Sequence, residues 1–380
     1  METEKLYYED CHLRVFQAQV LSCEKSDKGY QVVLDRTAFY PEGGGQACDL
    51  GTIGNAKVLD VREKEEGIVH LCDSPVEGRV DCAIDWDRRF DQMQQHAGEH
   101  IVSGIINRRY GYHNVGFHVG SDVVTIDFDG PIPQEDLETI QAEANAAIWQ
   151  NLAIRCWYPS REELPQVAYR SKKELPWPVR IVEVPGYDRC ACCGVHVKNT
   201  GEIGFVKLFT CVKFHQGVRI EMACGGRAIR FLDKIWEQNR LVSQAFSAKV
   251  LETGAAAQRM NEALAAEKFR ANNLEKQVFS AIAAEFADRG NVLYFAENLT
   301  PGGLRDLAEA IANVCGGTAA VFCEGNVCLV CKDGDVKALG QAMAKALDGR
   351  GGGKPGFFQG SVRAERPAIE AFFRENWGNL

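Results

Sequence analysis

Two histidines one helical turn apart, His96 and His100 in the pentapeptide His-Ala-Gly-Glu-His, have the types and spacing that metal chemistry requires. Imidazoles at positions i and i+4 of a helix project from one face, where both can bind the same metal ion. The pair by itself is an incomplete site, because an ion held in a protein takes further ligands. The rest of the chain must therefore supply partners.

A second half-site lies in the segment Cys-Ala-Cys-Cys-Gly-Val-His that ends at His196. Cys192 and His196 repeat the four-residue step, and Gly194 leaves the backbone free to fold around an ion. Together the half-sites offer three nitrogen ligands and one sulfur, a set that suits Zn²⁺ better than magnesium or calcium. Cys190 and Cys193 have CxxC spacing, so they would either compete for the ion or form a redox pair.

The remaining cysteines favour reduced thiols over a disulfide framework. The chain has 15 cysteines, an odd number, spread over 380 residues, which is too long to need disulfide staples. Cys328 and Cys331 also have CxxC spacing, but they lie in the apolar run VCLVC, where thiols behave as small hydrophobic side chains. We therefore assign these two residues to a core.

Composition describes a folded chain without membrane segments. Hydrophobic residues make up 46% and charged residues 25%, which excludes a disordered or low-complexity protein. No apolar run approaches 18 residues and the charged N-terminal segment lacks a signal-peptide core, so we expect a cytoplasmic protein with no membrane partner.

The formal charge of −9 excludes a general polyanion binder, so any contact with nucleic acid must use local basic patches. Such patches are either phosphate-binding surfaces or solvated faces. They comprise Lys198, Lys207, Lys213, Arg219, Arg227 and Arg230, and, further on, Arg350, Lys354 and Arg363.

The hydrophobic pattern predicts the elements that position the two half-sites. Short alternating runs over 13–85 predict a small antiparallel barrel, and apolar residues at steps of three and four predict a helix from Trp86 to about Gly111. Strands are expected over 115–128, 154–158 and from 179 onward, with a helix over 133–151. The segment 162–178, which contains Lys172, Lys173 and three prolines, reads as an exposed connection.

The last third of the chain changes character after Gly226. About sixty residues are helical in pattern, with Gly254 as a break, and predict a helical hairpin or an arm that pairs with a second copy. The last ninety residues predict a strand over 291–295, a helix over 304–315, a hairpin over 319–331, a helix over 336–347 and a glycine loop.

The expected fold class is α+β, in four parts. Residues 1–88 form a small glycine-rich β-barrel, 89–226 a metal-bearing domain, 227–286 a helical arm and 287–380 a small α/β domain.

At this point the motifs resemble those of a known family, the editing domain of alanyl-tRNA synthetase and its free-standing relatives, the AlaX proteins. The resemblance covers nearly the whole chain, as in the long AlaX type, and its motifs occur in the family's order. They are Thr37-Ala-Phe-Tyr-Pro-Glu-Gly-Gly-Gly-Gln46, the HxxxH pair, Gly116-Phe-His-Val-Gly120, CxxxH, Asn199-Thr-Gly-Glu-Ile-Gly204 and, in the C-terminal part, Gly351-Gly-Gly-Lys-Pro-Gly-Phe-Phe-Gln-Gly360. The last resembles the glycine motif shared by alanyl-tRNA synthetase and DHH-type phosphoesterases.

Some features depart from the family's patterns. There is no upstream aminoacylation domain and no Asp-His-His tripeptide, so we expect neither tRNA charging nor phosphoesterase activity. The family commonly has two glycines after its cysteine ligand, where this chain has Cys193 and Gly194. Glu99 is not expected between the family's histidines.

The resemblance implies a hydrolase that deacylates Ser-tRNA(Ala), and sometimes Gly-tRNA(Ala), while sparing Ala-tRNA(Ala). The need for such an enzyme is physical, because a small pocket discriminates weakly against a residue that merely adds a hydroxyl. One bound Zn²⁺ would polarise the ester carbonyl or activate a water. Its ligands would be His96, His100, Cys192 and His196.

Other residues receive roles through the same resemblance. Thr37 would offer its hydroxyl to the serine side chain, although from the residues alone it reads as a strand-end hydroxyl that caps a turn. Gln46 and the amides of Gly43, Gly44 and Gly45 would line the pocket, and Glu99 is placed where a general base could lie.

Further residues would line the pocket or contact the tRNA. His118, in the resembled GFHVG strand, would line the pocket, while Lys198 and Arg219 would follow the phosphates of the acceptor stem and Lys354 would contact tRNA through the C-terminal domain.

Three alternatives stay open from the sequence. Four protein ligands are typical of a closed structural zinc, so the ion either has one loose ligand, expands its coordination, or only orients the substrate. A second hypothesis interprets the pentapeptide as the HxxEH signature of a zinc metallopeptidase. Glu99 would then be the general base, and Cys192 would have no role as a metal ligand. A third is a non-catalytic tRNA-binding protein with a structural zinc, which would unfold when the metal is removed.

Overall fold

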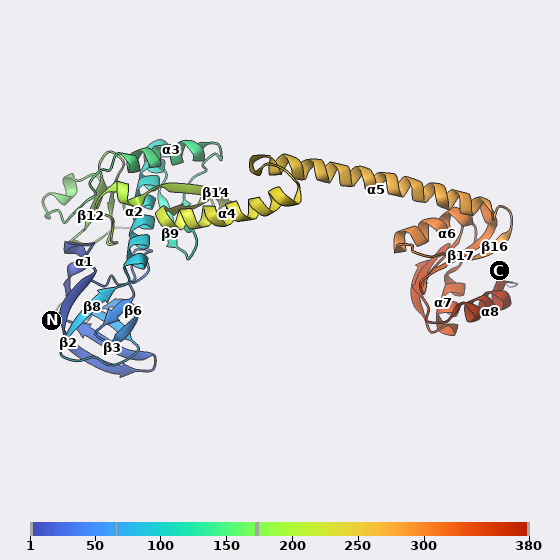
Figure 1. The fold of residues 1–380 in the computed structure, drawn as a ribbon, viewed down its shortest axis with the longest axis horizontal. Coiled ribbons are helices and arrows are strands. Elements are labelled where there is room, and N and C mark those ends of the chain that lie inside the picture. The colour runs from blue at the N-terminus through green and yellow to red at the C-terminus, as the bar shows by residue number, and fades with distance from the viewer. Residues whose placement is uncertain (1–2, 66, 172–174, 378–380) are drawn as a thin grey trace. The chain divides into compact units, whose positions relative to one another are not determined.

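The computed structural model describes residues 3–65, 67–171 and 175–377, which form two compact units, Met1–Arg240 and Leu241–Leu380. Helices and sheets occur in both, which confirms the α+β class. In the described part, no helix is long and apolar enough to cross a membrane. Each unit is described by itself (Figure 1).

The N-terminal unit begins with a closed barrel whose strands follow the order β2-β3-β7-β6-β5-β8. Apolar side chains alternate along these strands, and the inward set, such as Val32, Leu34 and Val61, is fully buried. The bounds are β2 (Val15–Ser26), β3 (Gly29–Leu34), β5 (Gly51–Ile53), β6 (Ala56–Lys64), β7 (Gly67–Cys72) and β8 (Arg79–Ile84). The short strands β1 (Glu4–Lys5) and β4 (Arg36–Thr37) pair in parallel beside it, and α1 (Leu6–Glu9) follows β1.

The long helix α2 (Trp86–Tyr110) leaves the barrel and passes through the centre of the unit (Figure 1). Its N-terminus is capped by the Asp85 carboxylate, which accepts the Arg88 N–H, and its C-terminus by Gly111 in the left-handed conformation. The predicted helix from Trp86 to about Gly111 is confirmed. Most of α2 after its first turn is buried, including both histidines.

Around α2 lie two sheets and a second helix. One sheet has the order β14-β15-β10-β9 and the other β11-β12-β13. The bounds are β9 (Asn114–Val119), β10 (Val124–Phe128), α3 (Asp136–Trp149), β11 (Arg155–Trp157), β12 (Ile181–Val184), β13 (Asp188–Ala191), β14 (Val206–Phe214) and β15 (Gly217–Cys224), with short 3-10 turns at Leu164–Gln166 and Thr200–Ile203. The predicted connection over 162–178 carries the first of these turns, and its residues 172–174, with both lysines, lie outside the described residues.

A buried ion pair fastens the glycine-rich loop to α2. Arg89 is fully buried and its Nε lies 2.9 Å from Oδ1 of Asp49, which is equally buried. Arg89 also donates to the carbonyl of Ala38, and Asp49 accepts the backbone N–H of Tyr40 at 2.6 Å. Breaking such a pair leaves an uncompensated buried charge. The start and the end of the loop over 38–49 are therefore held against the helix that carries the histidines.

The helical segment after β15 is built from α4 (Gly225–Ala245) and α5 (Thr253–Ala284), separated by a 3-10 turn at Val250–Glu252. The predicted break is confirmed in position, with Gly254 in the first turn of α5. Apolar side chains on both helices are exposed, for example Ile235 on α4 and Leu264 on α5. Pairing of this segment with a second copy stays a prediction.

The C-terminal unit contains a sheet of order β16-β17-β18-β20-β19 with buried side chains on both faces. Along β17, Val321 joins one core with α6, and its neighbour Phe322 joins the other with α7 and α8. Cys328 is buried as predicted, and Cys331 is half-buried. The bounds are β16 (Gly290–Phe295), α6 (Pro301–Cys315), β17 (Gly316–Cys323), β18 (Asn326–Cys331), α7 (Lys337–Ala346), β19 (Arg350–Lys354), β20 (Phe357–Ser361) and α8 (Arg366–Asn376).

The prediction of a glycine loop over 351–360 is wrong. These residues form the hairpin of β19 and β20, in which Gly351 pairs with Gly360 and Gly353 with Phe358. Glycine has no side chain to pack, so the sequence pattern favours a loop. The backbone pairing with β20, itself bonded to β18, is what orders the segment.

Candidate metal centre

The structure brings the two predicted half-sites together. His96 and His100 project from α2, and Cys192 and His196 come from the loop that follows β13. The Cys192 Sγ lies 3.4 Å from Nε2 of His96 and 3.4 Å from Nε2 of His196. One ligand atom from each of the four residues lies within 4.8 Å of the others. We call these four residues the metal quartet.

The donor set and its spacing fit a zinc ion. Bonds of ~2.3 Å to sulfur and ~2.0–2.1 Å to nitrogen in a tetrahedron place neighbouring S and N ligand atoms roughly 3.6 Å apart. The observed 3.4 Å is close to this value. The three histidines are only 2–3% exposed, whereas Cys192 is half-buried. The quartet therefore has the composition and convergence that Zn²⁺ requires.

Hydrogen bonds orient the histidines on α2. His96 Nδ1 lies 2.9 Å from Oε1 of Gln46, and His100 Nδ1 lies 2.9 Å from Oδ2 of Asp188. Each Nδ1 thus donates its proton to an oxygen, which leaves the Nε2 lone pair for a metal. Asp188 also accepts from Nε of Arg170 at 2.7 Å and from its Nη2 at 2.9 Å. Gln46 and Asp188 are thus supports of the quartet.

The local charges favour a thiolate at Cys192. Burial opposes ionisation, but His96 and hydrogen bonds to His100 and His196 hold the pKa of the Cys192 thiol well below its usual range. Burial and the neighbouring His96 lower the pKa of His196 to about 3, so this ring is neutral and available as a ligand. Against the effect of burial, Asp188 raises the pKa of His100, so a metal ion would displace a proton there.

Gly194 is required by a close approach of the loop to α2. A Cβ at this position would lie 2.2 Å from Cε1 of His96, 2.4 Å from its Nδ1 and 3.0 Å from Oε1 of Gln46. Real Cβ atoms essentially never approach so closely. The glycine therefore lets the ligand loop pass directly over the imidazole and its amide partner.

Arg180 and Tyr8 fix the backbone of the ligand loop. The Arg180 Nη1 donates to the carbonyls of Cys192 at 3.0 Å and Gly194 at 2.8 Å, and the Tyr8 hydroxyl donates to the carbonyl of Cys193 at 2.7 Å. The Arg180 guanidinium also lies over the Tyr8 ring, 4.6 Å from its centroid. Three successive carbonyls of the loop thus have side-chain donors.

A cavity of about 680 Å³ opens beside the quartet. Its size is that of a pocket for a drug-sized ligand. His96, His100 and Cys192 contribute to its lining, so the cavity borders the quartet. The rest of the lining comprises Tyr8, Gly44, Gly45, Glu99, Val115, Gly116, Phe117, Tyr158, Arg170, Ser171, Leu175, Pro176, Pro178, Val179, Arg180, Cys190, Ala191 and Cys193.

The glycine-rich loop reaches this cavity as expected from its sequence. Gly44 and Gly45 line it with φ of +60° and +83°, conformations that favour glycine. A Cβ on Gly45 would meet the Phe117 ring at 2.5 Å. Gly43 accepts the Tyr40 hydroxyl through its carbonyl and forms a bridge with Gln46, which closes the turn.

The structure places Thr37 in a buried network of the barrel. Because Nδ1 of His70 donates to the Val32 carbonyl, its Nε2 accepts the Thr37 hydroxyl at 2.9 Å. The same hydroxyl accepts the backbone N–H of Phe39 at 3.1 Å. In the described part of the chain, Thr37 is not among the cavity-lining residues. Its role toward serine stays a prediction.

Glu99 lines the cavity, but its carboxylate already has partners. It accepts the Ser103 hydroxyl at 2.5 Å and the Asn114 amide, and the residue is 4% exposed. The assignment of Glu99 as a general base stays a prediction as well.

The polar residues expected to bind tRNA lie outside the cavity. His118 is exposed on β9, and its strand neighbour Phe117 lines the cavity instead. Lys198 pairs with Asp10 at 2.8 Å, and Arg219 is held by both oxygens of Asp127 at 2.6 and 2.8 Å. Lys354 is exposed at the end of β19 in the other unit.

Sequence patterns do not reveal four residues that support the quartet or its loop, namely Asp188, Arg170, Arg180 and Tyr8. Tyr8 bonds to the ligand loop from 185 positions away, a distance at which local spacing gives no indication. The one available indication for Asp188 is its place two residues before Cys190, in a strand otherwise apolar on its inner face.

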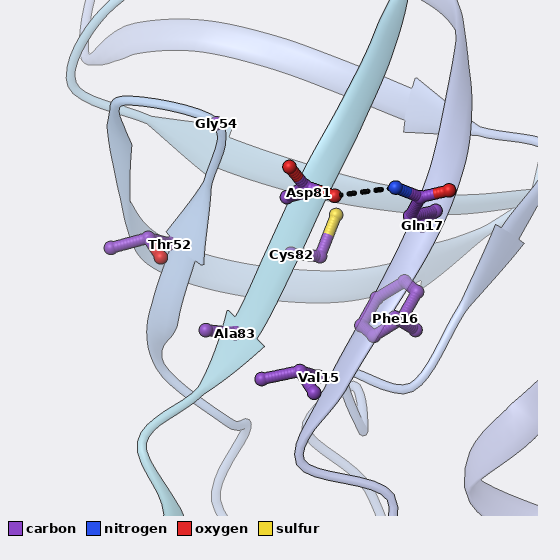
Figure 2. Close-up of a pocket in the computed structure, with 8 residues that line it drawn as sticks. All are labelled: Val15, Phe16, Gln17, Thr52, Gly54, Asp81, Cys82 and Ala83. Carbon is purple, nitrogen blue, oxygen red and sulfur yellow. Dashed lines mark hydrogen bonds between the residues drawn. The ribbon is translucent and has the colours of Figure 1, made fainter.

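The barrel has a separate hollow on its outer side, between β2, β5 and β8 (Figure 2). Val15, Phe16 and Thr52 contribute to its walls, and Gln17 donates to Asp81 at 2.8 Å across it. The described residues that line it bring no cluster of metal-binding or nucleophilic groups together. We assign it no chemistry.

Comparisons with known proteins agree with the geometry. Residues 179–221, which contain Cys192 and His196, match the threonyl and alanyl tRNA synthetase second additional domain, and residues 1–88 match the class II (A) tRNA synthetases. Alanyl-tRNA editing protein Aarsd1-A of Xenopus laevis is 27% identical over 96% of this chain and 96% of its own. The chain is a relative of the alanyl-tRNA editing proteins.

Further relatives cover smaller parts. Alanyl-tRNA editing protein AlaX-L of Pyrococcus horikoshii is 35% identical over 61% of this chain and 60% of its own length. An alanine--tRNA ligase of Ignicoccus hospitalis is 34% identical over 64% of this chain and 28% of its own. The solved structure of RecJ from Thermus thermophilus aligns with 37% of this chain and 27% of its own at 15% identity, and its TM-score of 0.26 carries no argument.

Proposed function

We propose that this chain is a zinc-dependent deacylase that acts in trans on mischarged tRNA(Ala), removing serine, and glycine as a second substrate, while sparing alanine. The observation that carries the proposal is a metal quartet facing a cavity lined by Gly44 and Gly45, in a relative of the alanyl-tRNA editing proteins. A mischarged tRNA carries its amino acid as an ester, and ester hydrolysis is chemistry that a metal site supports.

The quartet would hold one Zn²⁺. When bound, the ion would supply Lewis acidity to the ester carbonyl or lower the pKa of a water. Gln46 and Asp188 keep protons on the Nδ1 atoms of His96 and His100, so that both rings present Nε2. Arg180 keeps the ligand loop in place through its carbonyls.

Selectivity for serine requires a group that recognises its hydroxyl. We propose Thr37 for this contact and Glu99 as the general base. For Thr37 the geometry sets a condition, because its hydroxyl would have to leave Nε2 of His70 to donate elsewhere. Glu99 already lies in the cavity lining.

Binding of the tRNA would use Lys198, Arg219 and Lys354 toward phosphates and His118 at the outer face of β9. Lys198 and Arg219 pair with carboxylates, so phosphate contacts would compete with existing ion pairs and weaken with salt. Within this proposal, residues 1–88, 89–226, 227–286 and 287–380 act as barrel, editing domain, arm and tRNA-binding domain. The arm would form a homodimer, which light scattering tests directly.

The deciding experiment is the release of serine from Ser-tRNA(Ala), measured beside Ala-tRNA(Ala) and beside a Cys192→Ala variant. We expect release of serine, little release of alanine, and loss of both zinc and activity in the variant. Absence of serine release from the folded, zinc-loaded protein would overturn the proposal.

One observation favours a second candidate, a non-catalytic tRNA-binding protein. Four protein ligands are typical of structural zinc, whereas a catalytic ion keeps a position open. Removal of the metal separates the two functions. If the centre is catalytic, chelation silences a chain that stays folded, and if it is structural, chelation unfolds the N-terminal unit.

The position of Cys192 among the histidines disfavours the metallopeptidase hypothesis, because that hypothesis gives Cys192 no role. Full peptidase activity in Cys192→Ala would restore it.

A further inference from the structure

The cavity is larger than a seryl or glycyl group needs. Its volume of about 680 Å³ is within the range that accommodates drug-sized ligands, and the quartet contributes only three of its lining residues. If the proposed function holds, the amino acid is attached to the terminal adenosine of tRNA, so this nucleoside must lie next to the reacting ester.

A continuous path of contacts leads from the quartet to an aromatic side chain at the surface. Arg180 donates to the carbonyl of Cys192 and covers one face of Tyr8, and the Tyr8 ring is 6.5 Å from the ring of Tyr158 in an edge-to-face arrangement. Arg180, next to the ligand loop, is 9% exposed, whereas Tyr158 at the outer end of the path is 51% exposed. The inner end is the reaction centre, and the outer end is open to a ligand.

The ring of Tyr158 is more accessible to a ligand than the ring of Tyr8. Tyr8 is occupied by the guanidinium on its face and by the Cys193 carbonyl at its hydroxyl. Tyr158 lines the cavity, is half exposed, and its ring is set edge-to-face with the ring of Tyr8. An exposed aromatic face beside a cavity is the feature on which proteins stack unpaired bases.

We propose that Tyr158 is the stacking platform that binds the adenine of the terminal adenosine. The proposal rests on the proposed function. Stacking supplies affinity without reading Watson–Crick edges, which suits a base common to all tRNAs. Tyr158 is a binding residue here and takes no part in bond breaking.

The test compares two forms of uncharged tRNA(Ala), one ending in adenosine and one in which the terminal base has been removed to leave the ribose. We expect base removal to weaken equilibrium binding to the wild-type protein by about 5- to 150-fold, the range given by loss of one stacked base. For Tyr158→Ala the two tRNAs should bind equally. Tyr158→Phe keeps the ring and should behave as the wild type does.

Trp149→Ala provides the matched control, because Trp149 is an aromatic residue of the same unit, 75% exposed at the end of α3 and outside the cavity lining. This variant should keep the full difference between the two tRNAs. Equal sensitivity of wild type and Tyr158→Ala to base removal would overturn the proposal, as would a wild-type protein indifferent to the base.

Hydrolysis gives an independent readout. With Ser-tRNA(Ala), Tyr158→Ala should raise KM and leave kcat unchanged, because stacking binds ground state and transition state alike. A fall in kcat with unchanged KM would contradict a binding role. If the wild type releases no serine, the proposed function fails, whereas the binding comparison still decides the role of Tyr158.

Discussion

Replacing Gly194 by alanine gives a direct test of how the metal centre is assembled. The new Cβ would lie 2.2 Å from Cε1 of His96, whereas ordinary contacts begin at 3.4 Å. Either the imidazole or the ligand loop must therefore move by about 1.2 Å, the difference between these distances. Gly194 has no positive φ, so the effect is steric and not a consequence of backbone strain.

A displacement of this size exceeds what a zinc site tolerates. Ligand distances are held to about ±0.2 Å, so His96 would be lost as a ligand. Mutations that only disturb the partners of a ligand already reduce metal affinity ~10- to 100-fold, so we expect a loss of ~100-fold or more. Overpacking should also lower the free energy of unfolding of the metal-free protein by ~1–3 kcal/mol.

The assay is a competition titration of Zn²⁺ with a chromophoric chelator, together with urea unfolding of the metal-free chain. Gly226→Ala is the matched control, because its Cβ would meet only the Nη1 of Arg230 at 3.3 Å, the end of a side chain that is 67% exposed. That control should bind zinc as the wild type does. A Gly194→Ala protein with wild-type zinc affinity would refute the proposed arrangement of His96, the loop and the ion.

Further predictions concern support, protonation and the metal itself. Asp188→Asn weakens the acceptor of His100 Nδ1 and leaves the Arg170 guanidinium without its carboxylate partner. A chelator titration should therefore show ~10- to 100-fold weaker zinc binding. Burial lowers the pKa of His70 to about 4, so the folded chain keeps it neutral while the unfolded chain protonates it below ~6.5. Stability should therefore fall as pH drops from 6.5 toward 4, and urea unfolding of His70→Gln should lose ~3 kcal/mol less over that interval. Removal of zinc with a chelator should abolish serine release and leave far-UV circular dichroism intact, with activity restored by added Zn²⁺. Unfolding on chelation would show a structural centre.

Local patterns in the sequence account for the parts of the site that lie on one element. The apolar period from Trp86 and the glycine at position 111 predict the helix, and the four-residue steps identify both ligand pairs. These features depend only on residues within a turn or two of one another, so a single sequence displays them.

The supports of the quartet could not be found in this way. Asp188 contacts His100 across 88 residues of sequence. Arg180 donates to backbone carbonyls, which every residue has, so the sequence does not indicate which carbonyls it will contact. His118 shows a related difficulty. The sequence indicates the strand, but it does not indicate which face of the strand meets the cavity, and in the structure Phe117 lines the cavity. Long-range partners are fixed by topology, and topology is weakly encoded in local spacing.

The distribution of the quartet along the chain also determines when the site can exist. His96 and Cys192 are 96 positions apart, and Gln46, which supports the quartet, lies 50 positions before His96. At roughly 5–20 residues per second of synthesis, several seconds separate the appearance of the helix histidines from that of the thiolate. During that interval the nascent chain carries the two helix histidines without Cys192 and His196, so the complete quartet exists only once the ligand loop has been made and has docked on α2.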